Sequence, residues 1–381
     1  MTVVFGLSSL VALILYGCQK LYNPGPVKNT PNILVVEGVI DPSTDSTIIK
    51  LSRTVHVYAK TTVAPELGAV VTVEDDRNGV YPIPEIGGGS YAFPGLQLDI
   101  TRKYRLRIKT MDGQEYLSDL VPVKVTPPID SVGYNILRDS LQIYVSTHDP
   151  NDNTHYYRWS FDETWMFHAY YYSQYISTGY SLLERSIDQQ IYYCYTSDYS
   201  PTIVLATSAK LAHDVIYEAP LTLIRGSSEK IEREYSVLVR QYALTSDAST
   251  YWTNLKRNSE QLGGIFGVQP SEIAGNVHCI SNPAIPVIGY VGASTVTTKR
   301  IYIVNNSLPE RWQPVYPYSC SLKADTTADI YSDLIELPPP MLATDYIGSF
   351  FDPKGYYATS YECADCTLRG TTQQPSYWIL R

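Results

Sequence analysis

The sequence has little positive charge. Lys and Arg total 29 against 38 Asp and Glu, so the formal net charge is −9, and no cluster of basic residues stands out along the chain. Proteins that bind nucleic acids use Lys and Arg to neutralise phosphates, so we expect no nucleic-acid partner. Hydrophobic residues make up 44 % and charged residues 18 % of the chain, a balance typical of a folded protein.

Motifs that carry catalysis are also missing. The chain has no Gly-x-Ser-x-Gly elbow, no His-Glu-x-x-His motif and no phosphate-binding loop. The six histidines are scattered, and the adjacent carboxylates Asp75 and Asp76 precede Asn78-Gly79, a hairpin-turn signal. We therefore predict no catalytic residue and no cofactor. A glycosidase stays open as an alternative, because its two carboxylates need proximity in space and no fixed sequence spacing.

One segment has part of a calcium-loop pattern. Asp149, Asn151 and Asn153 have the 1-3-5 spacing of such a loop, but Thr154 stands where Gly is needed and Ser160 where Glu is needed. We interpret the segment as an Asx-rich turn, with an adventitious calcium site as the alternative, and we predict no dedicated metal site.

No apolar run is long enough to span a membrane. The residues from Val3 to Tyr16 are mostly apolar, but a spanning helix needs about 20 residues, and this length suits a secretory signal. Leu15-Tyr16-Gly17-Cys18 follows, with a small residue before a cysteine, the pattern of a bacterial lipoprotein signal. Two features depart from that pattern: no Lys or Arg precedes the run, and Tyr16 is bulky.

We therefore expect residues 1–17 to be a lipoprotein signal peptide and 18–30 to be a tether. Cys18 would be the lipidated residue, and acyl chains would hold the protein to the outer membrane, on the cell surface. A periplasm-facing anchor is the alternative orientation.

Apart from Cys18, the chain has an odd number of cysteines, so at least one thiol is free or externally paired. The five are Cys194, Cys279, Cys320, Cys363 and Cys366. An exported protein occupies a compartment where disulfides form, so all five are disulfide candidates and up to two bridges are expected.

Cys363 and Cys366 form a C-x-x-C pair, which also fits a redox pair or half of a zinc site. Zinc would need further ligands from Cys279, Cys320 and His278. The β-rich surroundings favour structural bridges that pin the tail onto the second domain, with the pairing left open.

Tyrosine is the abundant aromatic residue, with 34 Tyr against 7 Phe and 5 Trp. A dense group contains Tyr170, Tyr171, Tyr172 and Tyr175. Because Tyr combines a large ring with a polar tip, we expect these four side chains to form a contact surface for sugars, peptides or a partner protein. The alternative is a sheet face and its covering loop.

The pattern of short strands and turns predicts a mainly β protein. Residues 31–127 are expected to form an immunoglobulin-like or transthyretin-like sandwich, and 128–381 a larger β-rich domain. One central helix is expected near 246–262, capped by Ser246 or Asp247 and ended by Gly263-Gly264.

Three further segments receive specific predictions. We expect an irregular, Tyr-rich excursion over 163–180 and a short helix over 343–347. Residues 286–292 and 297–304 are expected to pair as a hairpin.

Several separated blocks resemble one family. They include Leu34-Val35-Val36-Glu37-Gly38, the stretch from Gly275-Asn276-Val277-His278-Cys279 to Pro283, and Cys363-Ala364-Asp365-Cys366. On these blocks the chain resembles an uncharacterised bacterial lipoprotein family, catalogued as domain of unknown function 4249, over nearly the whole mature chain. The family has no established activity, so the resemblance transfers no catalytic or binding residue.

The resemblance implies a Bacteroidota outer-membrane lipoprotein whose gene often lies beside a TonB-dependent transporter. We therefore expect a non-enzymatic accessory or substrate-capture partner of such a transporter. A structural or adhesive surface lipoprotein is one alternative, and a cryptic hydrolase is another.

Overall fold

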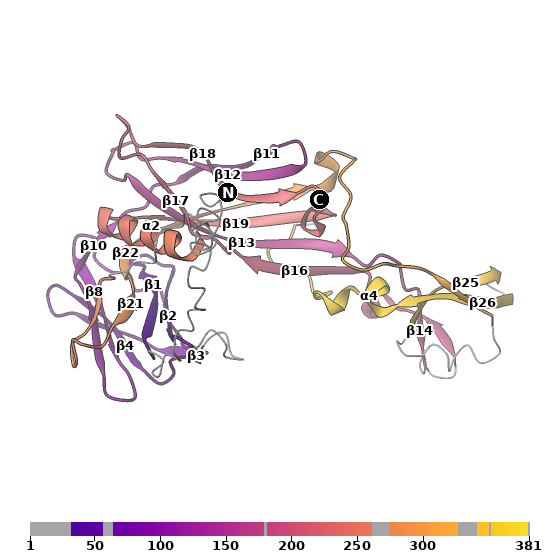
Figure 1. Cartoon of the computed structure of the whole chain (residues 1–381), viewed down its shortest axis with the longest axis horizontal. Helices are drawn as coiled ribbons and strands as arrows, with labels where there is room; N and C mark the ends of the chain where they lie inside the picture. Colours follow the sequence, from indigo (N-terminus) through magenta and orange to yellow (C-terminus); the bar gives the residue numbers. More distant parts are fainter. Residues whose placement is uncertain are drawn as a thin grey trace, which may run out of the picture.

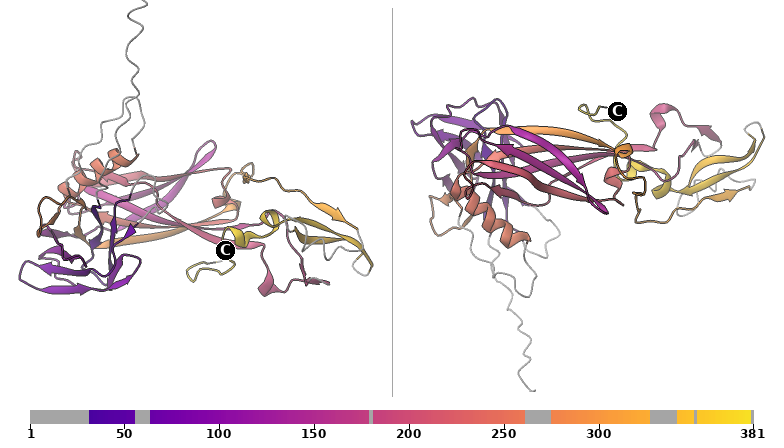
Figure 2. Two further views of the ribbon diagram at one scale, coloured as in Figure 1. Left: turned by 60° about the horizontal axis from the view of Figure 1, so that its bottom comes forward. Right: turned by 90° about the horizontal axis from the view of Figure 1, so that it is seen from above.

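The computed structural model describes residues 32–55, 64–178, 181–260, 275–326, 341–349 and 352–379. The expected signal peptide (1–17) and the whole expected tether (18–30), including Cys18, lie outside these residues. The described chain is elongated, with an N-terminal sandwich, a central sandwich and a projecting distal arm (Figures 1 and 2). Within the described residues, no helix has the length and apolarity to cross a membrane.

The N-terminal sandwich follows from alternating side chains. In β8, Tyr104, Leu106 and Ile108 are fully buried while the residues between them are partly exposed. Its first ten strands are β1 (Leu34–Ile40), β2 (Ser46–Arg53), β3 (Ala64–Pro65), β4 (Val70–Asp75), β5 (Val80–Ile83), β6 (Glu85–Gly87), β7 (Ser90–Pro94), β8 (Lys103–Lys109), β9 (Glu115–Ser118) and β10 (Val121–Lys124). The core lies between the sheet of β1, β2 and β7 and the sheet of β4 and β8.

The sandwich is completed by a segment from much later in the chain. The strands β20 (Val277–Cys279), β21 (Val287–Gly289) and β22 (Gly292–Ser294) pair with β9, β1 and β10. The expected division into 31–127 and 128–381 therefore needs correction, because this later segment buries its apolar side chains in the first core. The hairpin expected between 286–292 and 297–304 is also wrong, since β21 runs parallel to β1.

The central sandwich consists of two antiparallel sheets. One contains β11 (Ile129–Ile136), β12 (Ser140–His148) and β18 (Val215–Arg225); the other contains β13 (Tyr156–His168), β16 (Tyr193–Tyr199), β17 (Val204–Thr207), β19 (Glu234–Ala243) and β23 (Val296–Val304). Trp159, Phe161 and Val237 fill the core between them. β13 continues to His168, so the first third of the expected irregular excursion is a strand that pairs with both β16 and β19.

The one long helix of the described chain, α2 (Ser246–Glu260), confirms the central helix as far as residue 260. Its cap differs from the expectation, because the Thr245 hydroxyl accepts the Ala248 amide at 3.1 Å. The expected end at Gly263-Gly264 lies outside the described residues. Short turns of 3₁₀ helix are η1 (Ile187–Gln189), η2 (Glu229–Ile231), η3 (Asn305–Ser307) and η4 (Cys366–Leu368).

The distal arm is a small β structure that projects beyond the central sandwich (Figure 1). It contains β14 (Tyr175–Ser177), β15 (Leu182–Glu184), β24 (Lys323–Asp325), β25 (Met341–Ser349), β26 (Asp352–Ser360) and the single-turn α4 (Tyr361–Ala364). The helix expected over 343–347 is wrong, because those residues pair with β26 and bury Ala343 against Ala358. The prediction of a mainly β protein with sandwich sheets is confirmed.

Candidate functional site

Two disulfides hold the C-terminal segment. Cys194 of β16 bonds Cys366, and Cys320 bonds Cys363, each pair with its Cα atoms 5.7 Å apart. The two cysteines of the C-x-x-C pair therefore have different partners and do not bond each other. The structural role predicted for these four cysteines is confirmed.

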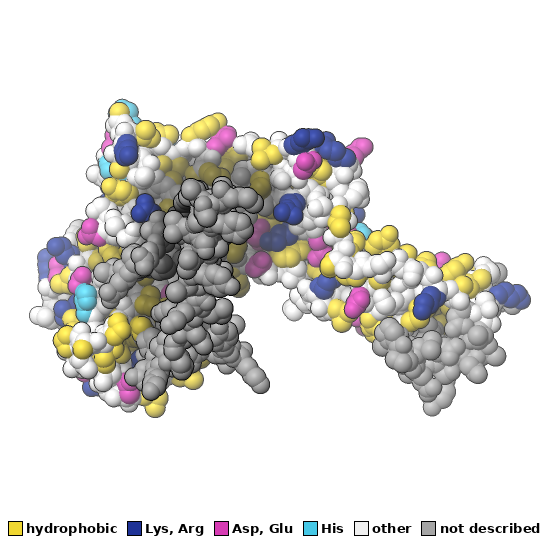
Figure 3. Space-filling view, in the orientation of Figure 1, with side chains coloured by type: hydrophobic (Ala, Val, Ile, Leu, Met, Phe, Trp, Pro, Cys, Tyr) yellow, Lys and Arg dark blue, Asp and Glu magenta, His cyan; other side chains and the backbone are white. Residues whose placement is uncertain are grey.

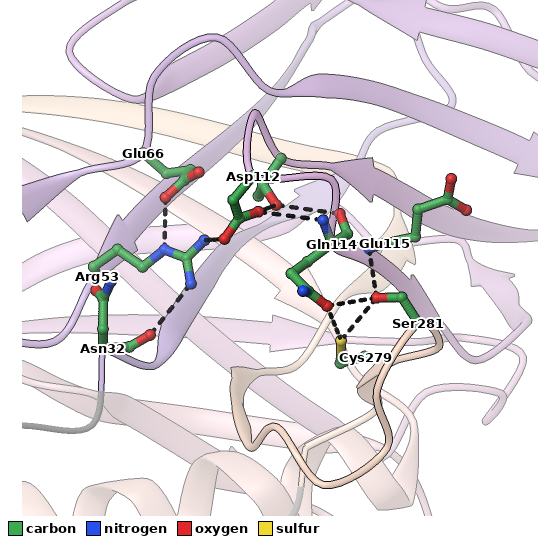
Figure 4. A network of polar contacts seen from close by, with 9 residues as sticks. Asn32, Arg53, Glu66, Asp112, Gln114, Glu115, Cys279 and Ser281 are labelled. Atoms are coloured by element: carbon green, nitrogen blue, oxygen red, sulfur yellow. Dashed lines mark hydrogen bonds and ion pairs between the residues drawn. The ribbon is translucent and has the colours of Figure 1, made fainter. Parts of the chain in front are cut away.

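Cys279 is the remaining thiol of the described chain, and it is buried in the N-terminal sandwich. Its Sγ lies 3.6 Å from Gln114 Oε1 and 3.4 Å from Ser281 Oγ, beside the network in which Arg53 binds Glu66 (Figure 4). The prediction that Cys279 is a disulfide candidate is wrong. Its Sγ contacts Gln114 and Ser281 in this network, and both disulfides of the described chain join other cysteines.

The ligands considered for a zinc site are not brought together. The His278 ring faces Asp119, with Nε2 3.4 Å from Oδ1, and is largely exposed. Cys320 is bonded to Cys363 and therefore offers no thiolate to a zinc ion. No group of three or more His, Cys, Asp or Glu side chains among the described residues is arranged to hold a metal ion.

The two acidic motifs of the sequence are turns, as interpreted. Asp149 accepts the backbone amides of Asn151 and Asn153 through its two carboxylate oxygens, both at 3.0 Å. Asp75 accepts the Gly79 amide at 2.7 Å and also binds Arg102, and these contacts, the Gly79 amide foremost, lower the pKa of Asp75 to about 2. Neither carboxylate is free for catalysis.

The tyrosines gather where the central sandwich meets the distal arm. We call this cluster the tyrosine junction; it consists of His168, Tyr170, Tyr171, Tyr172, Tyr192, Tyr193 and Tyr316. Three rings reach the surface, with exposed fractions of 49 % for Tyr170, 47 % for Tyr172 and 41 % for Tyr193. Tyr175 is 7 % exposed and packs in the arm's own core, so its assignment to a contact surface is wrong.

Neighbouring rings hold one another in place. Tyr192 stacks on His168 with a centroid distance of 5.0 Å and meets Tyr172 and Tyr193 edge to face at 5.2 and 4.7 Å. Tyr170 meets Tyr316 edge to face at 5.8 Å. Aromatic pairs at these distances are favourable beyond their buried area, so the exposed rings rest on a packed aromatic layer.

Glu232 is the polar centre beneath the rings. Its carboxylate accepts the His168 backbone amide at 3.2 Å, faces His168 Nε2 at 3.3 Å and accepts the Tyr316 hydroxyl. Burial and the Glu232 carboxylate raise the pKa of Tyr316 well above its ordinary range, so this phenol stays protonated as a donor. Both ring nitrogens of His168 are engaged, since Nδ1 also lies 2.7 Å from the Ala169 carbonyl oxygen.

The C-terminal segment fixes the other side of the junction. The Tyr171 amide donates to the Cys363 carbonyl at 2.8 Å. Arg369 forms an ion pair with Glu229, and its guanidinium lies 4.7 Å from the Phe167 ring centroid. The disulfide-bonded segment therefore positions the tyrosines.

Sequence reasoning missed Glu232 and Tyr316, which lie far along the chain from Tyr170 and belong to no motif. Arg369 follows the Cys363–Cys366 block on which the family resemblance rests, but the sequence assigned it no role. Chemically, the junction offers amphipathic rings on a rigid base, an arrangement that suits contact with a partner.

Comparison with known proteins gives a family without an established activity. None of the curated proteins matches the chain. One solved structure, a two fibronectin type-III domain segment from chicken tenascin, is 10 % identical with a TM-score of 0.17, over 55 % of this chain and 90 % of that one. A family model described as "Domain of unknown function (DUF4249)" matches residues 20–300. The chain is therefore a member of the DUF4249 family.

Proposed function

We propose that this protein is a non-enzymatic outer-membrane lipoprotein that uses the tyrosine junction to contact a partner protein. The observation that carries the proposal is the set of exposed rings of Tyr170, Tyr172 and Tyr193 above a layer locked by other rings and by Glu232. Rigid, amphipathic aromatic side chains are enriched at protein interfaces, because little side-chain entropy is lost when they bind.

The two disulfides support the export part of the proposal. Disulfides persist in oxidising compartments and are rare in the cytosol. Both bridges lie at the arm and junction, where they would protect the contact surface outside the cell. Lipid attached to Cys18 would place that surface near other membrane proteins.

A TonB-dependent transporter is the proposed partner class, and the protein would assist it in capturing substrate or in assembly. The support is the gene neighbourhood implied by the resemblance to the lipoprotein family. An adhesive surface role would use the same rings, and it would be favoured if the junction proved to bind cells or matrix without any transporter.

The anchor is tested by fractionating cells that express the Cys18→Ala variant. We expect the wild-type protein in the outer-membrane fraction and the variant in the soluble or inner-membrane fraction, with the Cys279→Ala protein as a control that behaves like wild type. A Cys18→Ala protein that stays in the outer membrane would contradict lipid anchoring.

The transporter role is tested by deleting the gene. We expect slower growth on the substrate of the adjacent transporter, restored by the wild-type gene and not by a gene with Tyr170, Tyr172 and Tyr193 changed to Ala. Unchanged growth on every substrate of that transporter would count against this role.

A further inference from the structure

A cavity of about 370 Å³ lies where the N-terminal sandwich meets the open face of the central sheet. Its polar walls are Asp41 and Asp45 from the β1–β2 turn, Arg158 from β13, Arg240 and Tyr242 from β19, and Thr298 from β23. Side chains of both charges are visible on the central part of the molecule, between the N-terminal sandwich and the distal arm (Figure 3). The cavity is separate from the tyrosine junction, and the size is within the range of small-ligand sites.

Arg158 is an unpaired cation in this cavity. Its guanidinium carbon lies 4.3 Å from the Tyr242 ring centroid and 4.4 Å from that of Trp252, so the group makes cation–π contacts with two rings. Its Nε is shielded from solvent and has no hydrogen-bond partner in the described chain. Burial lowers the pKa of Arg158. The negative charge of Glu37, which forms no ion pair with Arg158, opposes that shift.

The neighbouring arginine shows the contrast. Arg240 lines the same cavity and binds Asp162, with Nη2 2.6 Å from Oδ2. No carboxylate of the described residues takes that role for Arg158. A shielded charge without a partner is costly, and a bound anion would remove that cost. The planar fork of a guanidinium matches a carboxylate in particular.

The opposite wall carries negative charge. Asp41 is 2 % exposed; its Oδ1 accepts the Ser43 amide at 2.8 Å, while Oδ2 has no partner among the described residues. Burial raises the pKa of Asp41. Asp45 lines the same wall from an exposed position. A ligand with negative charge alone would be repelled here, whereas a hydrogen-bond donor with positive charge would be stabilised.

We propose that the cavity binds a small zwitterion, an amino acid or a short peptide, with its carboxylate on Arg158 and its ammonium group toward Asp41 and Asp45. A half-buried guanidinium without an ion pair among the described residues and a buried carboxylate with one unpartnered oxygen line one cavity of matching size. The pairing satisfies both at once, and it leaves Tyr242 and Thr298 to contact the body of the ligand.

The test is isothermal titration calorimetry of the full-length protein with three probes: the dipeptide Ala-Ala, its N-acetyl form and its C-terminal amide. We expect saturable binding of Ala-Ala and at least about tenfold weaker binding of each blocked form, because each lacks one charge-assisted contact. Because the protein is unchanged across the three titrations, a folding defect cannot imitate the result.

Variants locate the site. Arg158→Met keeps an unbranched apolar side chain between the rings and should weaken Ala-Ala binding about tenfold or more, as should Asp41→Asn. The control Arg138→Met alters an arginine that is 95 % exposed and should bind like wild type. Binding should also change the fluorescence of the protein, because Trp252 stacks on Arg158.

Three results would overturn the proposal: no saturable binding of Ala-Ala at millimolar concentration, equal binding of the free and blocked dipeptides, or binding that survives both Arg158→Met and Asp41→Asn.

Discussion

Replacing Cys194 and Cys366 together by alanine should destabilise the attachment of the C-terminal segment to the central sandwich. Both cysteines are fully buried and pack with Phe167 and Ala169. Beside the bridge, Tyr195 and Thr371 exchange backbone hydrogen bonds at 2.8 and 2.9 Å. The disulfide therefore adds a covalent restraint to a contact that hydrogen bonds and the Arg369–Glu229 ion pair also hold.

The magnitude follows from the loop that the disulfide closes. For a sequence separation of 172, loop-closure entropy gives about 5 kcal/mol, and for the 43 of Cys320–Cys363 it gives about 4 kcal/mol. Measured effects of removing a disulfide are often smaller, about 2–4 kcal/mol. At roughly 2–4 °C per kcal/mol, the melting temperature of this part should fall by about 4–16 °C.

The assay is thermal unfolding of wild type, Cys194→Ala/Cys366→Ala and Cys279→Ala, each with and without a thiol reductant. Reductant should lower the melting temperature of wild type and of Cys279→Ala, since Cys279 is in no disulfide. It should affect the double variant less, because only Cys320–Cys363 remains. A double variant that melts within about 1 °C of wild type would refute the reasoning.

The remaining predictions concern stability at three sites. Tyr175→Ala should cost about 2–3 kcal/mol, because the ring is in the arm's core. Tyr172→Ala should cost less, about 0.5–1.5 kcal/mol, because the half-exposed ring loses its edge-to-face pair with Tyr192; chemical denaturation measures both. Gln241→Leu should cost about 1–3 kcal/mol, because the buried Trp159 indole N–H donates to Gln241 Oε1 at 2.9 Å and would lose its acceptor; equal denaturation midpoints would contradict this. The folded-state pKa of Asp75, about 2, is below its ordinary 3.8, so its contribution to stability is present above about pH 4 and is lost as the pH falls toward 2. Asp75→Asn should therefore melt lower than wild type at pH 7, and its melting temperature should depend less on pH between 4 and 2.

Strands with clear alternation were predictable from the sequence. In β8 (103–109) Tyr104, Leu106 and Ile108 alternate with charged residues, and this alternation alone identifies a half-buried strand. The three-residue strands β20, β21 and β22 are too short to show a period, and their pairing with β1, β9 and β10 joins distant parts of the chain. The predicted division into 31–127 and 128–381 is therefore wrong for β20, β21 and β22, which belong to the N-terminal sandwich.

The candidate sites were predictable only in part. Tyr170 and Tyr172 stood out by composition and are exposed, but Tyr175 could not be separated from them, since nothing local indicates that it packs on Ala343 and Ala358. The odd number of cysteines predicted at least one free or externally paired thiol and up to two bridges, while the pairing needed spatial proximity. Nothing in the sequence marked Arg158 as part of a site, because its environment depends on Trp252, which comes from α2 far along the chain.

The most direct measurement of the central claim is an affinity pull-down of the tagged protein from mildly solubilised native outer membranes, read by mass spectrometry. Wild type is compared with Tyr170→Ala/Tyr172→Ala/Tyr193→Ala and with Tyr217→Ala, a matched change of a tyrosine that is 77 % exposed on β18. The account predicts stoichiometric recovery of a TonB-dependent transporter with wild type and with Tyr217→Ala, and its loss with the triple variant. Recovery of the lipoprotein alone from wild-type membranes, or equal recovery of the transporter with the triple variant, would contradict it.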